Sequence, residues 1–133
     1  MRIGRSTGYA LLATCYVAQH PEKKTVLSQE ISKKYEIPIE YLLKILQQLV
    51  RGNILRSKRG PRGGFNLARP ANKITMLQII EAVDGPLVSH MNLVDYAKRE
   101  KFSVNADKAF GKSLSQTRTI FQKTKLSDLI GAK

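Results

Sequence analysis

The sequence predicts a mainly α-helical protein with one small β-hairpin. Apolar residues recur at intervals of three and four in several segments, which is the spacing of one face of a helix. Two short apolar runs flank the stretch Gly60-Pro61-Arg62-Gly63-Gly64, whose composition is typical of a hairpin loop. With 133 residues, 42% of them hydrophobic, the chain is long enough for one domain with a core, or for a small domain with an assembly arm.

The first helix is expected from Ser6 to Gln19. Ser6 or Thr7 can cap its start, and it ends at His20, because the residue before Pro21 avoids the helical conformation. The apolar stripe of this helix consists of Tyr9, Leu12, Ala13, Tyr16 and Val17. This side of the helix should therefore face the core.

Two further helices follow. Ser28 is expected to cap a short helix that ends near Tyr35. Pro38 suits the first position of the next helix, which continues to Arg51. The apolar face of this third helix is formed by Leu42, Ile45, Leu46, Leu49 and Val50. Its polar face is formed by Glu40, Lys44, Gln47, Gln48 and Arg51. Two helices joined by a short turn, the second carrying cationic residues on its outer face, predict a helix-turn-helix.

The hairpin is expected to pair Ile54–Lys58 with Phe65–Ala68 and to form the wing of a winged helix-turn-helix. Its glycines allow a sharp turn and a close approach to another surface. A fourth helix should open at Thr75, where Gln78 completes a capping box, and end at Gly85.

The C-terminal part is expected to mediate dimerisation. Residues 87–105 are weakly patterned, with a short helix around Leu93, and lead into a long helix from about Ala106 to Lys123. We expect this helix to pack against its copy through Phe110, Leu114, Thr117 and Phe121. A last short helix follows near Leu126. The predicted organisation is a winged helix-turn-helix over 1–86, a connecting segment over 87–105 and a dimerisation region over 106–133.

The charge balance favours a polyanionic partner. Lysine and arginine number 23 against 10 acidic residues, giving a net charge of +13, and residues 1–70 hold 13 of the basic side chains but only 4 of the acidic ones. Nucleic acid and an anionic membrane surface both fit such a charge. No apolar run approaches the roughly 18 residues of a membrane span, and the N-terminus lacks an uninterrupted signal core, so we expect a cytoplasmic protein with no membrane partner.

Several motifs share a pattern with a known family. They are Gly8-Tyr9-Ala10-Leu11, Ile37–Leu42, Arg59–Phe65, Leu67–Pro70, Ile74–Pro86 and Leu126–Ile130. These segments resemble the Rrf2 family of bacterial winged-helix transcription regulators, and the resemblance covers nearly the whole chain. It implies a homodimer in which the long C-terminal helix makes the dimer and two winged helices bind a palindromic operator.

The resemblance also bears on sensing. Family members that sense through an iron–sulfur cluster carry three cysteines between the fourth helix and the dimerisation helix, where residues 87–105 of this chain have none. We therefore expect no cluster and no other cofactor, and a co-regulator protein or a small effector as the signal. The wing departs from the family pattern at Arg62, where glycine is frequent, and at Phe65, where tyrosine is common.

The third helix is expected to enter the major groove of DNA, because residues near the N-terminus of such a helix reach base edges. The candidate residues are Pro38, Glu40, Tyr41, Lys44 and Gln48. Glu40 can accept from the cytosine amino group, and Lys44 can donate to O6 and N7 of guanine. Alternatives stay open: Tyr41 packs on the helix flank, Pro38 only begins the helix, and Gln48 contacts phosphate or lies on a solvated face.

The wing is expected to enter the minor groove, where a narrow A·T segment attracts arginine. Arg59 is favoured for the groove because its position matches the wing arginine of the family, and Arg62 is a second groove contact or a phosphate clamp. Lys58 is a third candidate on the wing. Phosphate contacts are expected from Arg2, Arg5 and Arg51. The alternative is a cationic hairpin that contacts nothing specific.

The single cysteine excludes an intrachain disulfide and a metal site built from several cysteines of one chain. Cys15 is a semi-buried core residue, or else a redox-sensing thiol or a cluster ligand supplied once per subunit. No set of catalytic or metal-binding motifs appears, which argues against an enzyme. The sequence thus predicts a sequence-specific transcriptional regulator, acting as a dimeric repressor. The alternative is a non-specific architectural nucleic-acid-binding protein.

Overall fold

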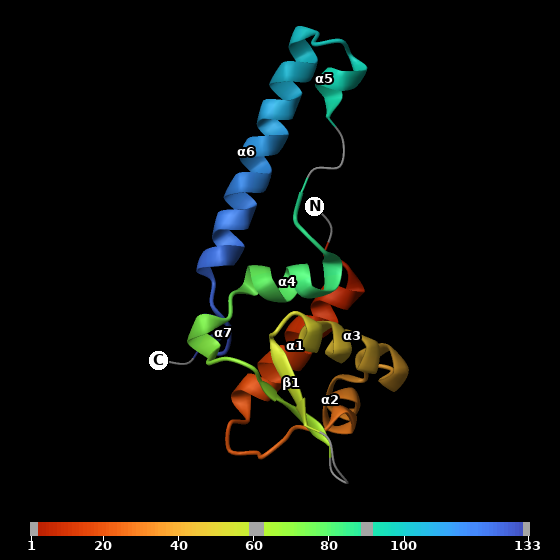
Figure 1. Cartoon of the computed structure of the whole chain (residues 1–133), viewed down its shortest axis with the longest axis vertical. Coiled ribbons are helices and arrows are strands. Elements are labelled where there is room, and N and C mark those ends of the chain that lie inside the picture. Colours follow the sequence, from red (N-terminus) through yellow and green to blue (C-terminus); the bar gives the residue numbers. More distant parts are fainter. Residues whose placement is uncertain (1–2, 59–62, 89–91, 132–133) are drawn as a thin grey trace.

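The computed structural model describes residues 3–58, 63–88 and 92–131 (Figure 1). In chain order, the elements within these ranges are α1 (Arg5–Gln19), α2 (Ser28–Tyr35), α3 (Ile39–Arg51), β1 (Leu55–Lys58), β2 (Gly64–Leu67), a short 3-10 helix (Ala71–Lys73), α4 (Met76–Asp84), α5 (Leu93–Tyr96), α6 (Lys101–Lys123) and α7 (Leu126–Leu129). Helices α1 to α4 and the hairpin form one body, from which α6 extends as a long arm with α5 beside its first turns (Figure 1). The predicted fold class, mainly helical with a two-stranded wing, is confirmed.

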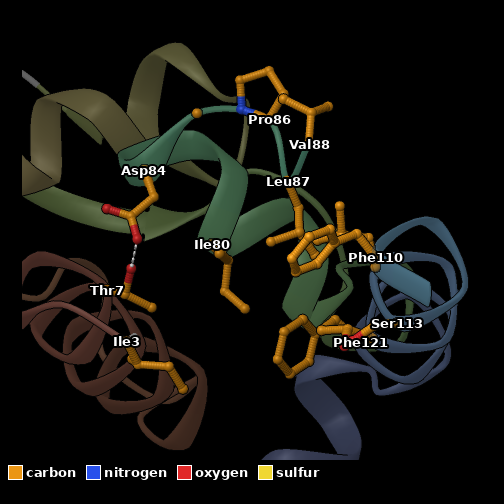
Figure 2. A pocket seen from close by; sticks show the side chains of 13 residues that line it. Ile3, Thr7, Ile80, Asp84, Pro86, Leu87, Val88, Phe110, Ser113 and Phe121 are labelled. Carbon is orange, nitrogen blue, oxygen red and sulfur yellow. Dashed lines mark hydrogen bonds between the residues drawn. The ribbon is translucent and has the colours of Figure 1, made fainter. Parts of the chain in front are cut away.

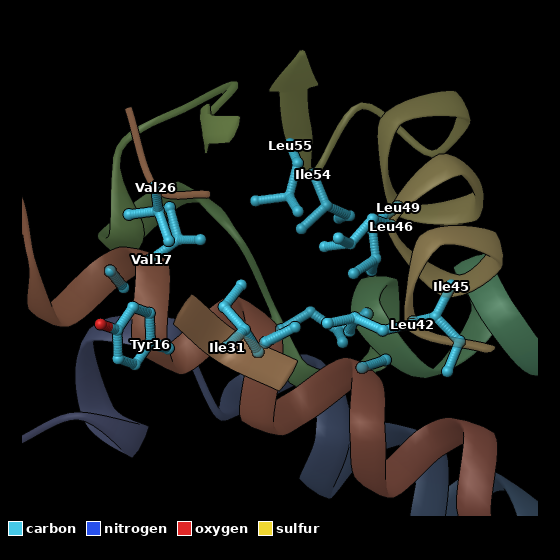
Figure 3. Packing of buried hydrophobic residues seen from close by; sticks show 14 of the residues in the cluster. Tyr16, Val17, Val26, Ile31, Leu42, Ile45, Leu46, Leu49, Ile54 and Leu55 are labelled. Atoms are coloured by element: carbon cyan, nitrogen blue, oxygen red, sulfur yellow. The ribbon is translucent and has the colours of Figure 1, made fainter. Parts of the chain in front are cut away.

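The core lies between α1, α2, α3 and the start of the hairpin (Figure 3). The predicted apolar face of α3 is confirmed for Leu42, Ile45, Leu46 and Leu49, which are all buried, whereas Val50 is only partly buried. The buried side chains of α3 belong to one core cluster with residues from outside this helix: Val26, Ile31, Ile37, Ile54 and Leu55. Each fully buried aliphatic side chain contributes about 1.5–3 kcal/mol relative to an exposed position.

The prediction for α1 was wrong in part. Leu12, placed on the apolar stripe, is 38% exposed, whereas Ala10, Ala13 and Thr14 are fully buried. Small side chains allow neighbouring helices to approach closely, and the Thr14 hydroxyl donates to the Ala10 carbonyl oxygen at 2.7 Å, so a polar residue is tolerated on this face. The predicted stripe is thus confirmed for Ala13, Tyr16 and Val17, and the buried side extends to Ala10 and Thr14 in place of Leu12.

The expected cap of α1 was also wrong. The helix begins after Gly4, which forms no side-chain cap. The hydroxyls of Ser6 and Thr7 make tertiary contacts instead: Ser6 Oγ shares a hydrogen bond with the Tyr41 hydroxyl at 2.7 Å, and Thr7 Oγ1 donates to Asp84 Oδ2. These two bonds join α1 to α3 and to α4.

Helices α2 and α3 each begin one residue away from the position that the sequence predicts. Ser28 is the first residue of α2, and the Glu30 carboxylate accepts the Leu27 N–H at 3.2 Å, so the reciprocal half of a capping box is present. Pro38 precedes α3 in an extended conformation (ψ 128°) rather than opening it. Glu36 adopts a left-handed conformation (φ 55°) that reverses the chain between the helices.

The hairpin boundaries also shift by one residue, because Leu55 pairs with Leu67 and Lys58 with Gly64. Val26, from the segment before α2, exchanges two backbone hydrogen bonds of 2.9 Å with Phe65 and so extends the sheet. A Cβ atom on Gly64 would lie 2.8 Å from the Val26 carbonyl oxygen. Glycine at this position therefore permits a close approach of two backbones, as expected for this wing.

The segment after the hairpin is held by polar contacts. The predicted capping box of α4 is confirmed, since Gln78 N donates to Thr75 Oγ1 at 3.1 Å and Thr75 N donates to Gln78 Oε1 at 3.0 Å. The Arg69 guanidinium donates to the Asn53 and Lys73 carbonyl oxygens and to Gln78 Oε1. This arginine braces the chain between β2 and α4.

The long helix begins at Lys101, five residues before the position predicted for it, Ala106. On this helix, both carboxylate oxygens of Asp107 accept backbone N–H groups, from Leu93 and Val94 at 3.0 Å each. The carboxylate satisfies the start of α5 and fastens it to α6. Such a contact between distant positions leaves no periodic signal in the sequence.

The C-terminal helix α7 returns to the first body. Leu126 is fully buried in the core, its N–H donates to the Ile74 carbonyl oxygen at 2.8 Å, and the Met76 N–H donates to the Thr124 carbonyl oxygen at 2.7 Å. The end of α6 is therefore anchored to the segment that opens α4. In the described part of the chain, no helix combines the length and the apolarity that crossing a bilayer requires.

Candidate nucleic-acid interface

The outward face of α3 carries the predicted base-contacting residues. Pro38, Glu40 and Lys44 are exposed, Gln48 is partly buried, and Arg51 is exposed at the last turn of the helix. Helices α2 and α3 and the hairpin gather at the end of the molecule opposite to α5 (Figure 1). The described strands of the wing thus lie at the same end of the molecule as α3.

Among the predicted base-contacting residues, Tyr41 makes the contacts expected of the alternative, in which it packs on the flank of its helix. Its hydroxyl bonds to Ser6 Oγ at 2.7 Å, and its ring stands edge-on to Tyr9 with 5.5 Å between the ring centroids. The side chain is nevertheless 41% exposed. Tyr41 therefore packs on the flank of α3 that faces α1, and fixes the orientation of α3 on that helix.

The cationic candidates are only partly within the described ranges. Arg5, Arg51 and Lys58 are exposed, as is Arg56 on β1. The candidates Arg2, Arg59 and Arg62 lie outside the described residues.

Sequence reasoning missed two exposed apolar residues on α3. Ile39 is 37% exposed and Leu43 is 39% exposed, although the rest of the aliphatic pattern of the helix points to the core. The adjacent pair Leu42-Leu43 holds a signal for this, because only one of two consecutive residues can lie at the centre of a buried helix face. These side chains broaden the outward surface of α3 beyond its polar residues.

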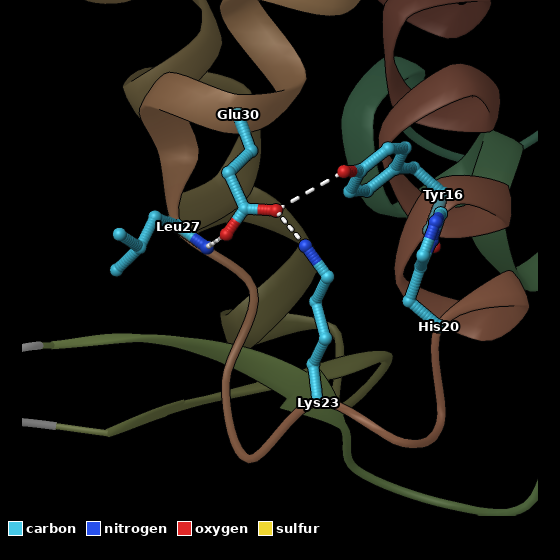
Figure 4. Close-up of polar contacts among 5 residues, drawn as sticks. All are labelled: Tyr16, His20, Lys23, Leu27 and Glu30. Atoms are coloured by element: carbon cyan, nitrogen blue, oxygen red, sulfur yellow. Dashed lines mark hydrogen bonds and ion pairs between the residues drawn. The ribbon is translucent and has the colours of Figure 1, made fainter.

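A polar cluster fastens the start of α2 to α1 (Figure 4). The Glu30 carboxylate accepts from the Lys23 ammonium group and from the Tyr16 hydroxyl, the latter at 3.0 Å. The hydrogen bond from Lys23 holds the pKa of Glu30 below its usual value. Burial, and then the hydrogen bond to Glu30, raise the pKa of Tyr16. The imidazole of His20 lies 4.2 Å from the Tyr16 ring, centroid to centroid. This cluster sets the position of the first helix of the helix-turn-helix.

The single cysteine has the surroundings of a core residue. Cys15 is partly buried against the core cluster, and burial raises the pKa of its thiol, which opposes formation of a reactive thiolate. One cysteine in the chain does not fit a cluster with three cysteine ligands from one subunit. Within the described residues, no group of three or more histidine, cysteine, aspartate or glutamate side chains could hold a metal ion.

The stripe predicted for dimerisation lines an apolar cleft of about 590 Å³ (Figure 2). All four predicted residues contribute to this cleft: Phe110, Leu114, Thr117 and Phe121. The opposite wall comes from the start of α1, from α4 and from the segment after it, through Ile3, Ile80, Leu87 and Val88. Phe110 is 54% exposed, and Ile3 and Val88 are exposed as well. An ion pair of 2.8 Å between Arg118 and Glu81 holds α6 against α4.

Comparisons with known proteins agree with this architecture. Residues 3–132 match the Rrf2 family, described as iron-dependent transcriptional regulators. A putative helix-turn-helix transcriptional regulator of Aquifex aeolicus is 34% identical over 125 residues, covering 92% of this chain and 86% of the relative. The structure of a putative transcriptional regulator of Listeria innocua has a TM-score of 0.82 and 26% identity, with coverage of 98% and 87%. The structure of CymR, the global cysteine regulator of B. subtilis, has a TM-score of 0.78 and 22% identity, with coverage of 98% and 97%.

Proposed function

The chain belongs to the Rrf2 family of DNA-binding transcriptional regulators, and from that premise we propose that two copies bind a palindromic operator sequence-specifically and repress transcription by occluding a promoter. The observation that carries this proposal is the outward face of α3, where Glu40, Lys44 and Arg51 are exposed on a helix whose other side is locked into the core. A rigid helix with exposed charged and amide side chains can present hydrogen-bonding groups to base edges with fixed geometry.

The exposed polar and cationic side chains divide into base readers on α3 and phosphate contacts around it. Glu40 and Lys44 lie in its first two turns, the part that reaches base edges, with Pro38 before them and Gln48 one turn later. Arg5, Arg51, Arg56 and Lys58 supply phosphate contacts around them. Arg59 and Arg62 extend the wing into the minor groove. In this scheme Tyr41 orients α3 and does not itself read a base.

We propose that the cleft beside α6 is the dimer interface, covered by α6 of a second copy. An interface with two-fold symmetry places the same stripe on both sides, and an exposed phenylalanine beside an apolar cleft fits such self-complementary packing. Phe110→Asp should convert the dimer to monomers in sedimentation velocity. Phe102→Asp is the control, because this equally exposed phenylalanine of α6 does not line the cleft. A dimer that survives Phe110→Asp would refute the interface.

The signal of this regulator is proposed to be a co-regulator protein or a small effector. Sensing through a cluster with three cysteine ligands from one subunit does not fit, since the chain has one cysteine. Because its partner is chromosomal DNA, we expect the protein to act in the bacterial cytoplasm.

Selection of duplexes from a random pool, followed by affinity measurements over a salt series, tests sequence-specific binding. Specific binders gain a factor of roughly 10³ or more over random DNA. Lys44→Ala should reduce that factor, whereas Lys101→Ala, at the far end of α6, should leave it unchanged. Arg59→Ala should cost about 1–3 kcal/mol of specific binding if this arginine reads the minor groove. Salt-sensitive binding with no preferred sequence would instead favour an architectural nucleic-acid-binding protein.

A further inference from the structure

One flank of α3 is apolar and exposed, and the hydrogen-bonding scheme above makes no use of it. Ile39 is the first residue of the helix and Leu43 lies one turn later, so both point to the same side. Their exposed fractions are 37% and 39%, while Leu42 on the core side is fully buried. Both side chains therefore present more than a third of their surface to solvent.

This flank adjoins the polar residues of the reading face. Leu43 comes three residues after Glu40 and four before Gln47, which makes the three side chains neighbours on the helix surface. The opposite flank is occupied by Tyr41, which packs on α1 through Ser6 and Tyr9. A duplex that meets Glu40 and Lys44 therefore also meets the side of α3 that carries Leu43.

The chemistry of the major groove identifies what an apolar side chain can bind there. The groove presents donors and acceptors at every base pair, and its one apolar group is the 5-methyl of thymine. Exposed Lys44 and Arg51 supply the positive charge that draws the same helix surface toward the phosphates. The two apolar side chains lie in the first half of α3, from which base edges are reached.

We propose that Leu43, with Ile39 beside it, recognises thymine through its 5-methyl group, so that each operator half-site contains a thymine read by apolar contact. This inference rests on the proposed function, since it assumes that α3 lies in the major groove. It adds a specificity determinant that acts without a hydrogen bond.

Replacement of thymine by deoxyuridine tests the proposal, because it removes the methyl group and leaves base pairing intact. The probe is a duplex that the wild-type protein selects from a random pool, with one thymine replaced at a time and the Kd measured by fluorescence anisotropy. Loss of one buried methyl group should weaken binding about fourfold, and symmetric loss in both half-sites about fifteenfold.

The matched variants are Leu43→Ala and Leu12→Ala, which shorten two leucines of similar exposure on α3 and α1. In Leu43→Ala the preference for thymine over deoxyuridine should fall well below the wild-type value, because Ile39 and the alanine methyl retain only part of the contact, whereas Leu12→Ala should keep the wild-type preference. Circular dichroism checks that both variants are folded, and the deoxyuridine scan of the wild-type protein needs no variant at all.

The outcomes separate this inference from the proposed function. Specific binding that tolerates deoxyuridine at every position would overturn the thymine contact and leave the regulator intact, and would be expected if a protein partner covers this flank. A thymine preference in Leu43→Ala as large as that of the wild type would also overturn it. Selection of no preferred sequence would overturn the proposed function, and the thymine contact with it.

Discussion

Leu126 tests whether the C-terminal helix is part of the winged-helix core. Its side chain is fully buried although it follows the long arm formed by α6. Leu126→Ala removes three carbon atoms from the core, which costs about 2.4 kcal/mol in transfer free energy, and the cavity left behind adds to this. We expect the free energy of unfolding to fall by about 3–4 kcal/mol. The measurement is urea denaturation at one fixed protein concentration, because the stability of a dimer depends on concentration.

The matched control lies on the same helix. Leu129 is 39% exposed, so Leu129→Ala should change the free energy of unfolding by less than about 1 kcal/mol. Leu126 also anchors the end of α6, the proposed dimerisation helix, to the winged-helix body. At temperatures where the Leu126→Ala variant stays folded, we therefore expect its dimer to bind operators over a wider range of distances between the two half-sites. A loss of stability no larger than that of Leu129→Ala would refute the inclusion of α7 in the core.

Three further predictions concern the wing, the long helix α6 and the start of α2. Gly64→Ala should lower the free energy of unfolding by about 1–3 kcal/mol and weaken DNA binding, since its Cβ would meet the Val26 carbonyl oxygen. Gly111→Ala, with open space around its Cβ in α6, should raise stability by about 0.5–1 kcal/mol in the same urea assay. The pKa of Glu30 is held below its ordinary value of 4.5, so its ionised form stabilises the fold above that pH and this contribution is lost as the pH falls through the lowered pKa. Glu30→Gln should therefore be less stable than the wild type at pH 7, and the difference should shrink toward pH 3. A difference that does not change with pH would exclude the ion pair with Lys23 as its cause.

The sequence predicted the elements whose signals are local. The buried face of α3 follows from a helical spacing of aliphatic residues, and the cap of α4 follows from Thr75 and Gln78, which lie three residues apart. The hairpin was located to within one residue, because its strands are bounded by turn-forming residues. Helical spacing placed the predicted dimerisation stripe on residues that line a cleft.

Features that depend on tertiary contacts were not predictable. The buried side of α1 is selected by the close approach of its neighbours to Ala10 and Thr14, which no hydrophobicity pattern reports. The early start of α6 accompanies the contact of Asp107 with the backbone of α5. The exposure of Leu43 is consistent with its absence from the predicted apolar face, but the spacing of α3 alone does not show how much of its side chain reaches the surface.

Methylation interference on a selected duplex tests the central claim, that the outward face of α3 reads the major groove. Methylation of guanine N7 blocks the major groove, whereas methylation of adenine N3 blocks the minor groove. We predict two symmetric clusters of interfering guanines about one helical turn apart, and loss of at least one guanine from each cluster in Lys44→Ala. Interference confined to adenine N3, or a guanine pattern identical in Lys44→Ala, would contradict the account.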